Sequence, residues 1–333
     1  METVYTINKF VIVEPSQTGG YVCIGSRQKH IKDNILWNNI ISVLYLFYEG
    51  RKISEVLALS KINDKNFYSI VSMLIENNFI TPIREKNEAY ARYDRNFIHY
   101  MSYGGDPIRI QENLLNAKVT IIGCGGIGNH VSAILAGAGV GEITLVDCDT
   151  IELSNLTRQY LFTENDIGNK KTTTLKRELL KRNSSLKINE IELSINSEDD
   201  FKQIPSSNIW VLSADEPLEI GAWLHSYCYK NNQAYIRGCY LNDISVYGPM
   251  FIPKISKNYS LNNYPNDINR DKRIKKINSN FKPATFPSIT ITAAACCAGD
   301  IIKYIGGYAS PLSIDKRIGI WSDEILIKSI DME

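Results

Sequence analysis

Apolar residues in the middle of the chain fall into two short runs, Val119 to Ile122 and Ile143 to Val146. Between them lies a glycine-rich turn, followed by small residues as far as Gly139. A short apolar run bounded by turn residues is typical of a buried strand, and the small-residue segment is long enough for a helix. The pattern therefore predicts a strand–helix–strand unit of the kind found in parallel α/β sheets.

The turn has the spacing G-x-G-x-x-G, formed by Gly123, Gly125 and Gly128, with Gly126 between them. Glycine lets backbone N–H groups approach a phosphate at the N-terminus of the next helix, where the helix dipole favours negative charge. Asp147, directly after the second strand, lies where an acid commonly binds a ribose hydroxyl. Together these residues predict a nucleotide site, and they do not distinguish NAD from ATP.

Further apolar segments continue this fold toward the C-terminus. A helix is predicted at residues 288–304, and short strands are predicted at residues 188–193, 209–212, 234–238, 245–251, 318–321 and 324–327. Residues 253–283 differ, because they contain eight Lys or Arg and seven Asn and show almost no apolar periodicity. We expect this segment to be a crossover loop that folds over a bound substrate. Its basic charge either attracts an anionic substrate or keeps the loop soluble.

Residues 1–88 have a pattern of their own and are predicted to form a small separate domain. Helices and strands alternate in it as in a winged helix-turn-helix, with strands at 6–13, 20–24 and 79–83 and helices at 34–48, 54–59 and 64–77. The third helix lacks the Lys and Arg residues that meet DNA phosphates, so we expect no nucleic-acid partner. An open sheet edge in such a domain can accept an extended peptide as an added strand. A folding or dimerisation role is the alternative.

The bulk composition fits about two globular domains. The chain has 333 residues, 44% of them hydrophobic, and a formal net charge of +1, which gives no electrostatic case for binding nucleic acid or membranes. We find no run of about 20 apolar residues and no secretory signal. Seven cysteines without a pairing pattern suit a reducing compartment, so we expect a cytoplasmic protein.

Polar side chains follow several of the predicted strands, where open α/β sheets place their ligands. Arg158 and Lys171 can neutralise triphosphate charge, and Asn155, with Gln159 nearby, can fix a phosphate or a hydroxyl. Asp215, in the segment SADEP, can hold Mg²⁺ through its carboxylate. The alternatives are a solvated loop and helix for the first group and an ordinary turn for Asp215.

Several motifs then occur in a characteristic order. GCGGIG, LVDCD, SNLTRQ, GNKK and SADEP resemble the adenylating domain of the E1, MoeB and ThiF superfamily over about residues 90–330. The resemblance implies that the nucleotide is ATP, and that a carboxylate attacks its α-phosphate to give an acyl adenylate and pyrophosphate. It also implies residue roles: Asp147 binds the ribose, Asp215 positions Mg²⁺, and the phosphates are held by Asn155, Arg158 and Lys171.

Two further segments resemble parts of this superfamily. RYDRN is similar to its N-terminal arginine segment, in which Arg95 reaches into the partner subunit's site, so the resemblance implies a homodimer. FKPATF, the alanine-rich helix and KRIGIWSDEI resemble the peptide-maturing branch, which includes the enzymes that mature microcin C and pantocin A. The resemblance to the microcin C enzyme implies a peptide-clamp domain, here residues 1–88, before an adenylating domain, here residues 89–333.

Two departures from the family pattern bear on the chemistry. Members often hold zinc with two C-x-x-C pairs, and this chain has none, so we expect no zinc. No cysteine lies between Cys239 and Cys296, so the predicted crossover loop offers no thioester nucleophile, which disfavours a ubiquitin-type route. The missing zinc pairs favour a pantocin-type relative over the microcin C enzyme.

We therefore expect a Rossmann-like α/β enzyme that uses ATP and Mg²⁺ to activate a carboxyl or carboxamide group of a small ribosomally made peptide. Cyclisation or dehydration would follow. The alternatives are transfer of AMP to the peptide C-terminus and MoeB-type adenylation of a sulfur-carrier protein. An NAD-dependent dehydrogenase leaves Arg158 and Lys171 without a role, and a winged-helix sensor that binds nucleotide without turnover is the non-enzymatic rival.

Overall fold

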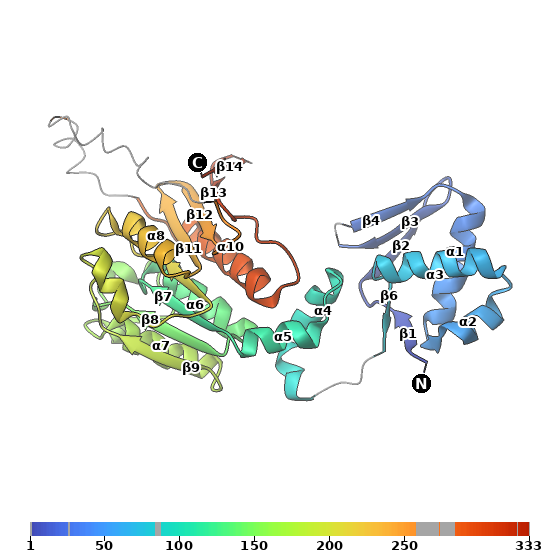
Figure 1. Cartoon of the computed structure of the whole chain (residues 1–333), viewed down its shortest axis with the longest axis horizontal. Coiled ribbons are helices and arrows are strands. Elements are labelled where there is room, and N and C mark those ends of the chain that lie inside the picture. The colour runs from blue at the N-terminus through green and yellow to red at the C-terminus, as the bar shows by residue number, and fades with distance from the viewer. Residues whose placement is uncertain are drawn as a thin grey trace. The chain divides into compact units, whose positions relative to one another are not determined.

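A computed structural model of the chain describes residues 2–25, 27–83, 88–257, 273, 284–324 and 326–332 (Figure 1). The chain divides into two units, Met1–Gln111 and Glu112–Glu333. Each unit is described by itself. The functional boundary predicted at residue 88 adjoins residues 84–87, which lie outside the described ranges, and it stays a prediction.

The first unit combines helices with two small antiparallel sheets, in the orders β5-β1-β6 and β2-β3-β4. Its elements are β1 (Val4–Ile7), β2 (Val11–Pro15), β3 (Gly20–Ile24), β4 (Arg27–Ile31), α1 (Asn34–Phe47), β5 (Arg51–Lys52), α2 (Ile53–Ser60), α3 (Asp64–Glu76), β6 (Ile80–Pro82), α4 (Asp94–Ser102) and α5 (Pro107–Leu115), which crosses the boundary.

Helices α1, α2 and α3 share an apolar core, which includes Val43, Phe47, Val56, Phe67 and Leu74. The three predicted helices of this region are confirmed, because each has apolar residues on the face that meets this core. The predicted strand at 6–13 is wrong, since β1 and β2 are two strands separated by a turn. The order of helices and strands agrees with a winged helix, which stays an interpretation.

The second unit is built on one eight-stranded sheet with the order β14-β13-β12-β11-β10-β7-β8-β9. The strands from β11 to β9 are parallel, and β12, β13 and β14 are antiparallel additions. The strands are β7 (Lys118–Ile122), β8 (Glu142–Val146), β9 (Lys187–Ile191), β10 (Ile209–Leu212), β11 (Tyr235–Leu241), β12 (Ile244–Phe251), β13 (Lys316–Trp321) and β14 (Ile327–Asp331). The predicted α/β class with a parallel sheet is confirmed.

The strand order reverses at β7, because the chain continues through β8 and β9 on one side and returns to β10 and β11 on the other. Such a switch point leaves a crevice at the carboxyl ends of the strands. Helix α6 (Gly126–Ala138) packs against α10 (Pro287–Gly306), and α10 also contacts β11 and β12. Helix α8 (Ile220–Lys230) joins β10 and β11 in a separate apolar cluster, and α7 (Lys171–Arg182) contacts β8 and β9.

Helix α10 differs from the expectation that no apolar run approaches the length of a membrane span. Its 20 residues are long and apolar enough by length and composition to cross a membrane. Half of the relevant window is buried inside the protein, as in the core helix of a globular domain. Most of the predicted crossover loop at 253–283 lies outside the described residues, which include only 253–257 and 273 of it.

Candidate active site

The glycine turn between β7 and α6 lies at the switch point of the sheet. Gly123 has a φ of +93°, and a Cβ atom there would lie 2.7 Å from the backbone nitrogen of Ala214. A Cβ atom on Gly128 would lie 1.9 Å from the carbonyl oxygen of Gly123. Both positions therefore require glycine. Gly125 is the N-cap of α6, so the unpaired N–H groups of that helix lie at the carboxyl edge of the sheet.

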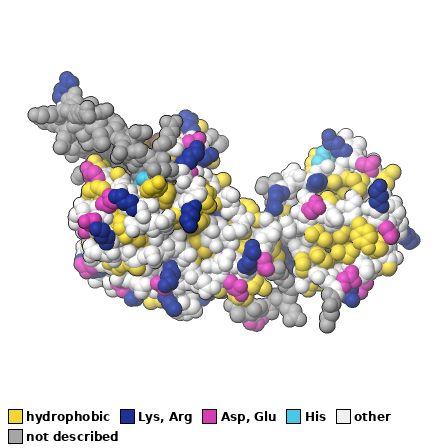
Figure 2. All heavy atoms as spheres, viewed as in Figure 1, with side chains coloured by type: hydrophobic (Ala, Val, Ile, Leu, Met, Phe, Trp, Pro, Cys, Tyr) yellow, Lys and Arg dark blue, Asp and Glu magenta, His cyan; other side chains and the backbone are white. Residues whose placement is uncertain are grey.

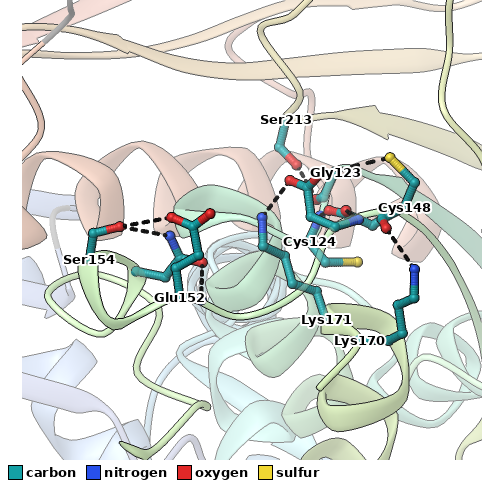
Figure 3. A network of polar contacts seen from close by, with 11 residues as sticks. Gly123, Cys124, Cys148, Glu152, Ser154, Lys170, Lys171 and Ser213 are labelled. Carbon is teal, nitrogen blue, oxygen red and sulfur yellow. Dashed lines mark hydrogen bonds and ion pairs between the residues drawn. The ribbon is translucent and has the colours of Figure 1, made fainter. Parts of the chain in front are cut away.

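The end of β10 closes one side of this turn. The hydroxyl of Ser213, the first residue after β10, donates to the carbonyl oxygen of Gly123 at 2.6 Å (Figure 3). Its backbone nitrogen donates to the carbonyl oxygen of Ile122 at 2.9 Å. Asp215 follows two residues later and is exposed. The residue predicted to hold Mg²⁺ is thus at the same sheet edge as the predicted phosphate site.

Asp147, which directly follows β8, ties its strand to the glycine turn. One carboxylate oxygen accepts a hydrogen bond from the backbone nitrogen of Cys124 at 2.6 Å, and the other accepts from the backbone nitrogen of Asp149 at 2.8 Å. A carboxylate oxygen has more than one lone pair, so each oxygen keeps acceptor capacity for a ligand hydroxyl. The place predicted for a ribose-binding acid is therefore compatible with that role.

Two lysines precede and begin α7, and the structure places them differently. The ammonium of Lys171 is largely buried and lies 2.7 Å from a carboxylate oxygen of Asp149. The ammonium of Lys170 donates to the carbonyl oxygen of Cys148 and to Glu192 at the rim of the sheet (Figure 3). Lys171, the residue singled out from the sequence, is thus the lysine that Asp149 holds inside the site.

The segment after β8 carries Asn155 and places Arg158 and Gln159 beside the glycine turn. Asn155 is buried, and its side-chain oxygen accepts from the backbone nitrogen of Glu152 at 3.1 Å. The Arg158 stem crosses Gly126, because a Cβ atom on that glycine would lie 3.3 Å from Cγ of the arginine. Asn155, Arg158 and Lys171 all belong to the chain that follows the carboxyl end of β8, and their predicted roles in holding phosphates stay predictions.

Gln159 also belongs to this group, and the sequence analysis assigned it no role. It is 2% exposed, and its side-chain oxygen has no hydrogen-bond partner within the described part of the chain. Its amide nitrogen would lie 3.9 Å from a Cβ atom on Gly125. An unpaired buried amide oxygen accepts hydrogen bonds, so beside the glycine turn it fits a ligand group that donates one, such as a hydroxyl of a nucleotide. In the sequence, the only indication that Gln159 belongs to the site is that it directly follows Arg158.

His130, on α6, fixes the segment that carries Arg158. Its Nε2 atom is hydrogen-bonded to the carbonyl oxygen of Arg158 at 3.0 Å, and its ring meets that of Tyr160 edge to face. Burial lowers the pKa of His130 below its ordinary value, although the bond to the carbonyl opposes this shift. The imidazole is therefore neutral at physiological pH and acts as a positioning group.

Cys124, the buried cysteine of the glycine turn, is a poor nucleophile. Burial, aided by the charge of Asp147, raises the pKa of the Cys124 thiol well above its ordinary value. The potential ligand atoms of Asp147, Cys148 and Asp149 lie within 4.8 Å of one another, and this set does not include Asp215. The expectation that the chain holds no zinc stays a prediction.

Arg95 is the one predicted site residue outside the second unit. It is exposed on α4 of the first unit, whereas the glycine turn belongs to the second unit. Its predicted reach into a partner subunit stays a prediction.

Comparison with known proteins matches this arrangement to one family. The ThiF family model matches residues 93–322. A crystal structure of E. coli MccB with ATP is 47% identical, covers 99% of this chain and 97% of that chain, and has a TM-score of 0.91. A crystal structure of PaaA covers 97% of this chain and 99% of that chain with a TM-score of 0.72, at 19% identity, which shows the fold alone.

Curated relatives resemble a smaller part of the chain. The molybdopterin-synthase adenylyltransferase of Salmonella typhimurium is 31% identical over 147 residues, which are 44% of this chain. The matched region spans 57% of that enzyme, and thus little more than half its length.

Proposed function

This chain belongs to the ThiF family of ATP-dependent adenylating enzymes, and we propose that its substrate is a small ribosomally made peptide. The enzyme activates a carboxyl or carboxamide group of that peptide with ATP. The observation that carries this proposal is the similarity along the whole chain, first unit included, to MccB. MccB has been crystallised with ATP and with N-formylated MccA, its precursor peptide.

The residues of the site support ATP as a substrate. Asp147 is placed to accept hydrogen bonds from the ribose, and the N–H groups at the start of α6 meet the phosphates. Arg158 and Lys171 supply donors on the other side of the phosphates. A triphosphate carries more negative charge than the pyrophosphate of NAD, so two cations beside the glycine turn favour ATP.

Activation joins two groups of like charge, and the cations make their approach possible. A carboxylate oxygen of the peptide forms a bond to the α-phosphorus, and the bond from that phosphorus to the pyrophosphate oxygen breaks. Arg158 and Lys171 stabilise the charge that builds up on the leaving pyrophosphate. Mg²⁺, when bound at Asp215, would add a further positive charge next to the phosphates.

We propose that AMP stays on the peptide C-terminus, as in a microcin C-type reaction. The chain is 47% identical to MccB and 19% identical to PaaA, so the greater similarity favours this outcome. It reverses the preference for pantocin-type cyclisation that the missing C-x-x-C pairs suggested. Cyclisation with loss of water remains the alternative outcome, and both reactions begin with the same adenylation.

The first unit offers a surface for the peptide leader. β2 and β4 are the outer strands of their sheet among the described residues, so each has an unpaired edge that can accept an added strand. Hydrophobic side chains gather on the visible face of this unit (Figure 2). Its exposed large hydrophobic residues include Ile12, Val13, Ile35, Tyr45 and Tyr48. We propose that this unit is the leader-binding clamp.

The chemistry can be tested through peptide-dependent release of pyrophosphate. Arg158→Ala and Asp215→Ala should each lower the rate by about 100-fold or more, because each removes a charge that stabilises the transition state. Lys187→Ala is the matched control, since this exposed cation begins β9 at the opposite edge of the sheet. Full turnover in both site variants would show that the pocket is misplaced.

We also propose that the enzyme is a homodimer in which Arg95 of one subunit acts in the site of the other, and this has a separate test. Arg95→Ala and Asp215→Ala enzymes should each be inactive alone. After mixing and subunit exchange they should recover partial activity, because one composite site then has both residues intact. A mixture as inactive as its parts would rule out action of Arg95 across subunits.

A further inference from the structure

Arg237 is a charged residue that the proposed adenylation has not used. It lies on β11 next to Leu212, the last residue of β10, in the parallel register of the two strands. Asp215 follows only three residues after Leu212. The pairing of β11 with β12 shifts between Ile236, which pairs with Met250, and Gly238, which pairs with Tyr247, so Arg237 lies opposite two residues of a bulge in β12. Bulges are frequent beside active sites.

The Arg237 guanidinium lies against the backbone of Gly221, in the first turn of α8. A Cβ atom on Gly221 would lie 2.5 to 2.7 Å from three atoms of the guanidinium, so a side chain there would displace it. Nη1 of Arg237 is buried without a hydrogen-bond partner. Across the described residues, no hydrogen bond or ion pair of this arginine is found. A buried, unpaired charged donor is costly and indicates a missing anionic partner.

The surroundings of Arg237 favour an anion. The guanidinium and the positive end of the α8 dipole meet in the first turn of that helix. Burial raises the pKa of the neighbouring Cys239 thiol, while the charges of Arg237 and Arg317 oppose the rise and that of Asp215 adds to it. The charges of two arginines and one aspartate therefore act on this point.

We propose that Arg237 binds the C-terminal carboxylate of the peptide substrate and sets the preference for a free acid. The phosphates have their own donors on the β7–β8 side of the switch point, in Arg158 and Lys171. Arg237 lies on the opposite side of β10, where the group that attacks the α-phosphate has to approach. A guanidinium matches a carboxylate with two parallel hydrogen bonds, which holds it at a fixed orientation. This inference rests on the proposed peptide substrate.

The test is a binding measurement without turnover. MccA, the peptide crystallised with MccB, is synthesised with a fluorescent N-terminal label, as the free acid and as the C-terminal amide. Wild-type enzyme should bind the acid about 10- to 100-fold more tightly than the amide. Arg237→Ala should bind both forms equally, at the affinity of the amide, and Arg237→Lys should keep part of the preference because it keeps the charge.

Two further variants separate recognition from stability. Gly221→Ala retains the arginine but displaces its guanidinium, so it should also lose the preference for the acid. Lys230→Ala, at the far end of α8, should keep it. A wild-type enzyme without preference, or an Arg237→Ala enzyme that binds both peptides more weakly by the same factor, would overturn the inference. Wild-type binding of neither peptide would instead count against the proposed peptide substrate.

Discussion

Single side chains fix the glycine turn and the segment that carries Arg158 mainly through hydrogen bonds to the backbone. The Asp147 carboxylate, the Ser213 hydroxyl and the His130 imidazole each bond to a main-chain group of the glycine turn or of the segment carrying Arg158. Such bonds fix the position of N–H groups and cations before a ligand arrives. Preorganised donors of this kind stabilise a charged transition state without a further cost of reorganisation.

Gly128→Ala should disrupt the turn. The new Cβ atom would lie 1.9 Å from the Gly123 carbonyl oxygen and 2.7 Å from the Ser213 hydroxyl, so the backbone must shift. We expect a loss of about 1–3 kcal/mol in the free energy of unfolding, measured by urea denaturation, with loss of ATP binding. Gly137→Ala, on the same helix with open space around it, should instead be neutral or stabilising. Equal stability of the two variants would contradict this geometry.

His130 should make stability depend on pH between about 7.5 and 5.5. Its pKa is lowered in the folded protein, so the unfolded chain binds more protons as the pH falls through about 6.5. Stability is therefore lost on acidification. In His130→Gln, urea denaturation at the two pH values should show a smaller loss. His30→Gln, at an exposed position of β4, should keep the wild-type loss, and an unchanged loss in His130→Gln would exclude this role.

Residue identities at the site were partly predictable from the sequence. Glycine spacing and the acid after β8 marked the turn and Asp147, because both follow from local chain geometry. Gln159 and Arg237 received no role, since their significance is that a buried polar atom lacks a partner. That property arises only when strands distant in the sequence come together, and no local pattern contains it.

Helices and strands differ in how well the pattern predicted them. Helix α10 and strand β10 match the predicted ranges closely, because their buried faces carry continuous apolar signals. β4 was missed, since only its last residue, Ile31, is buried and the others are polar and exposed. β14 was placed a few residues too early, because all five of its residues are exposed. Edge strands are fixed by pairing with a neighbour rather than by burial.

The turn before α7 is anchored by one buried carboxylate. Asp166 accepts from the nitrogen and hydroxyl of Thr163, both at 2.8 Å, and from Arg177 of α7 at 2.6 Å. Asp166→Ala should lower the free energy of unfolding by about 1–3 kcal/mol, because three hydrogen bonds that tie the turn to α7 are lost together. Asp199→Ala removes only an exposed ion pair with Lys202 and should cost less than about 1 kcal/mol.

The pH dependence of Asp166 provides a second measurement. Burial alone would raise its pKa, but the hydrogen bonds from Arg177 and Thr163 lower it below the ordinary value. The stabilisation is thus present above the unfolded pKa of about 3.9 and is lost as the pH falls through the lower folded pKa. Asp166→Ala and wild type should therefore converge in stability in strong acid. A constant difference across all pH values would contradict the ionic origin.

In the molecule as a whole, the two units have separate cores. The apolar cluster around Val43, Phe47 and Phe67 lies within the first unit. A fragment of residues 1–115, ending where α5 ends, should therefore fold alone, with a helical circular dichroism spectrum and a cooperative thermal transition. If the fragment were unfolded, the first unit would depend on the second for its stability.

The most direct measurement on the whole enzyme is the intact mass of MccA, the peptide crystallised with MccB, as a probe substrate. The peptide is incubated with enzyme, ATP and Mg²⁺ and compared with a sample lacking ATP. We predict an ATP-dependent gain equal to an added AMP group, abolished in Arg158→Ala. A loss of water would leave adenylation standing but contradict retention of AMP. An unchanged peptide, with modification of a sulfur-carrier protein instead, would contradict a peptide substrate.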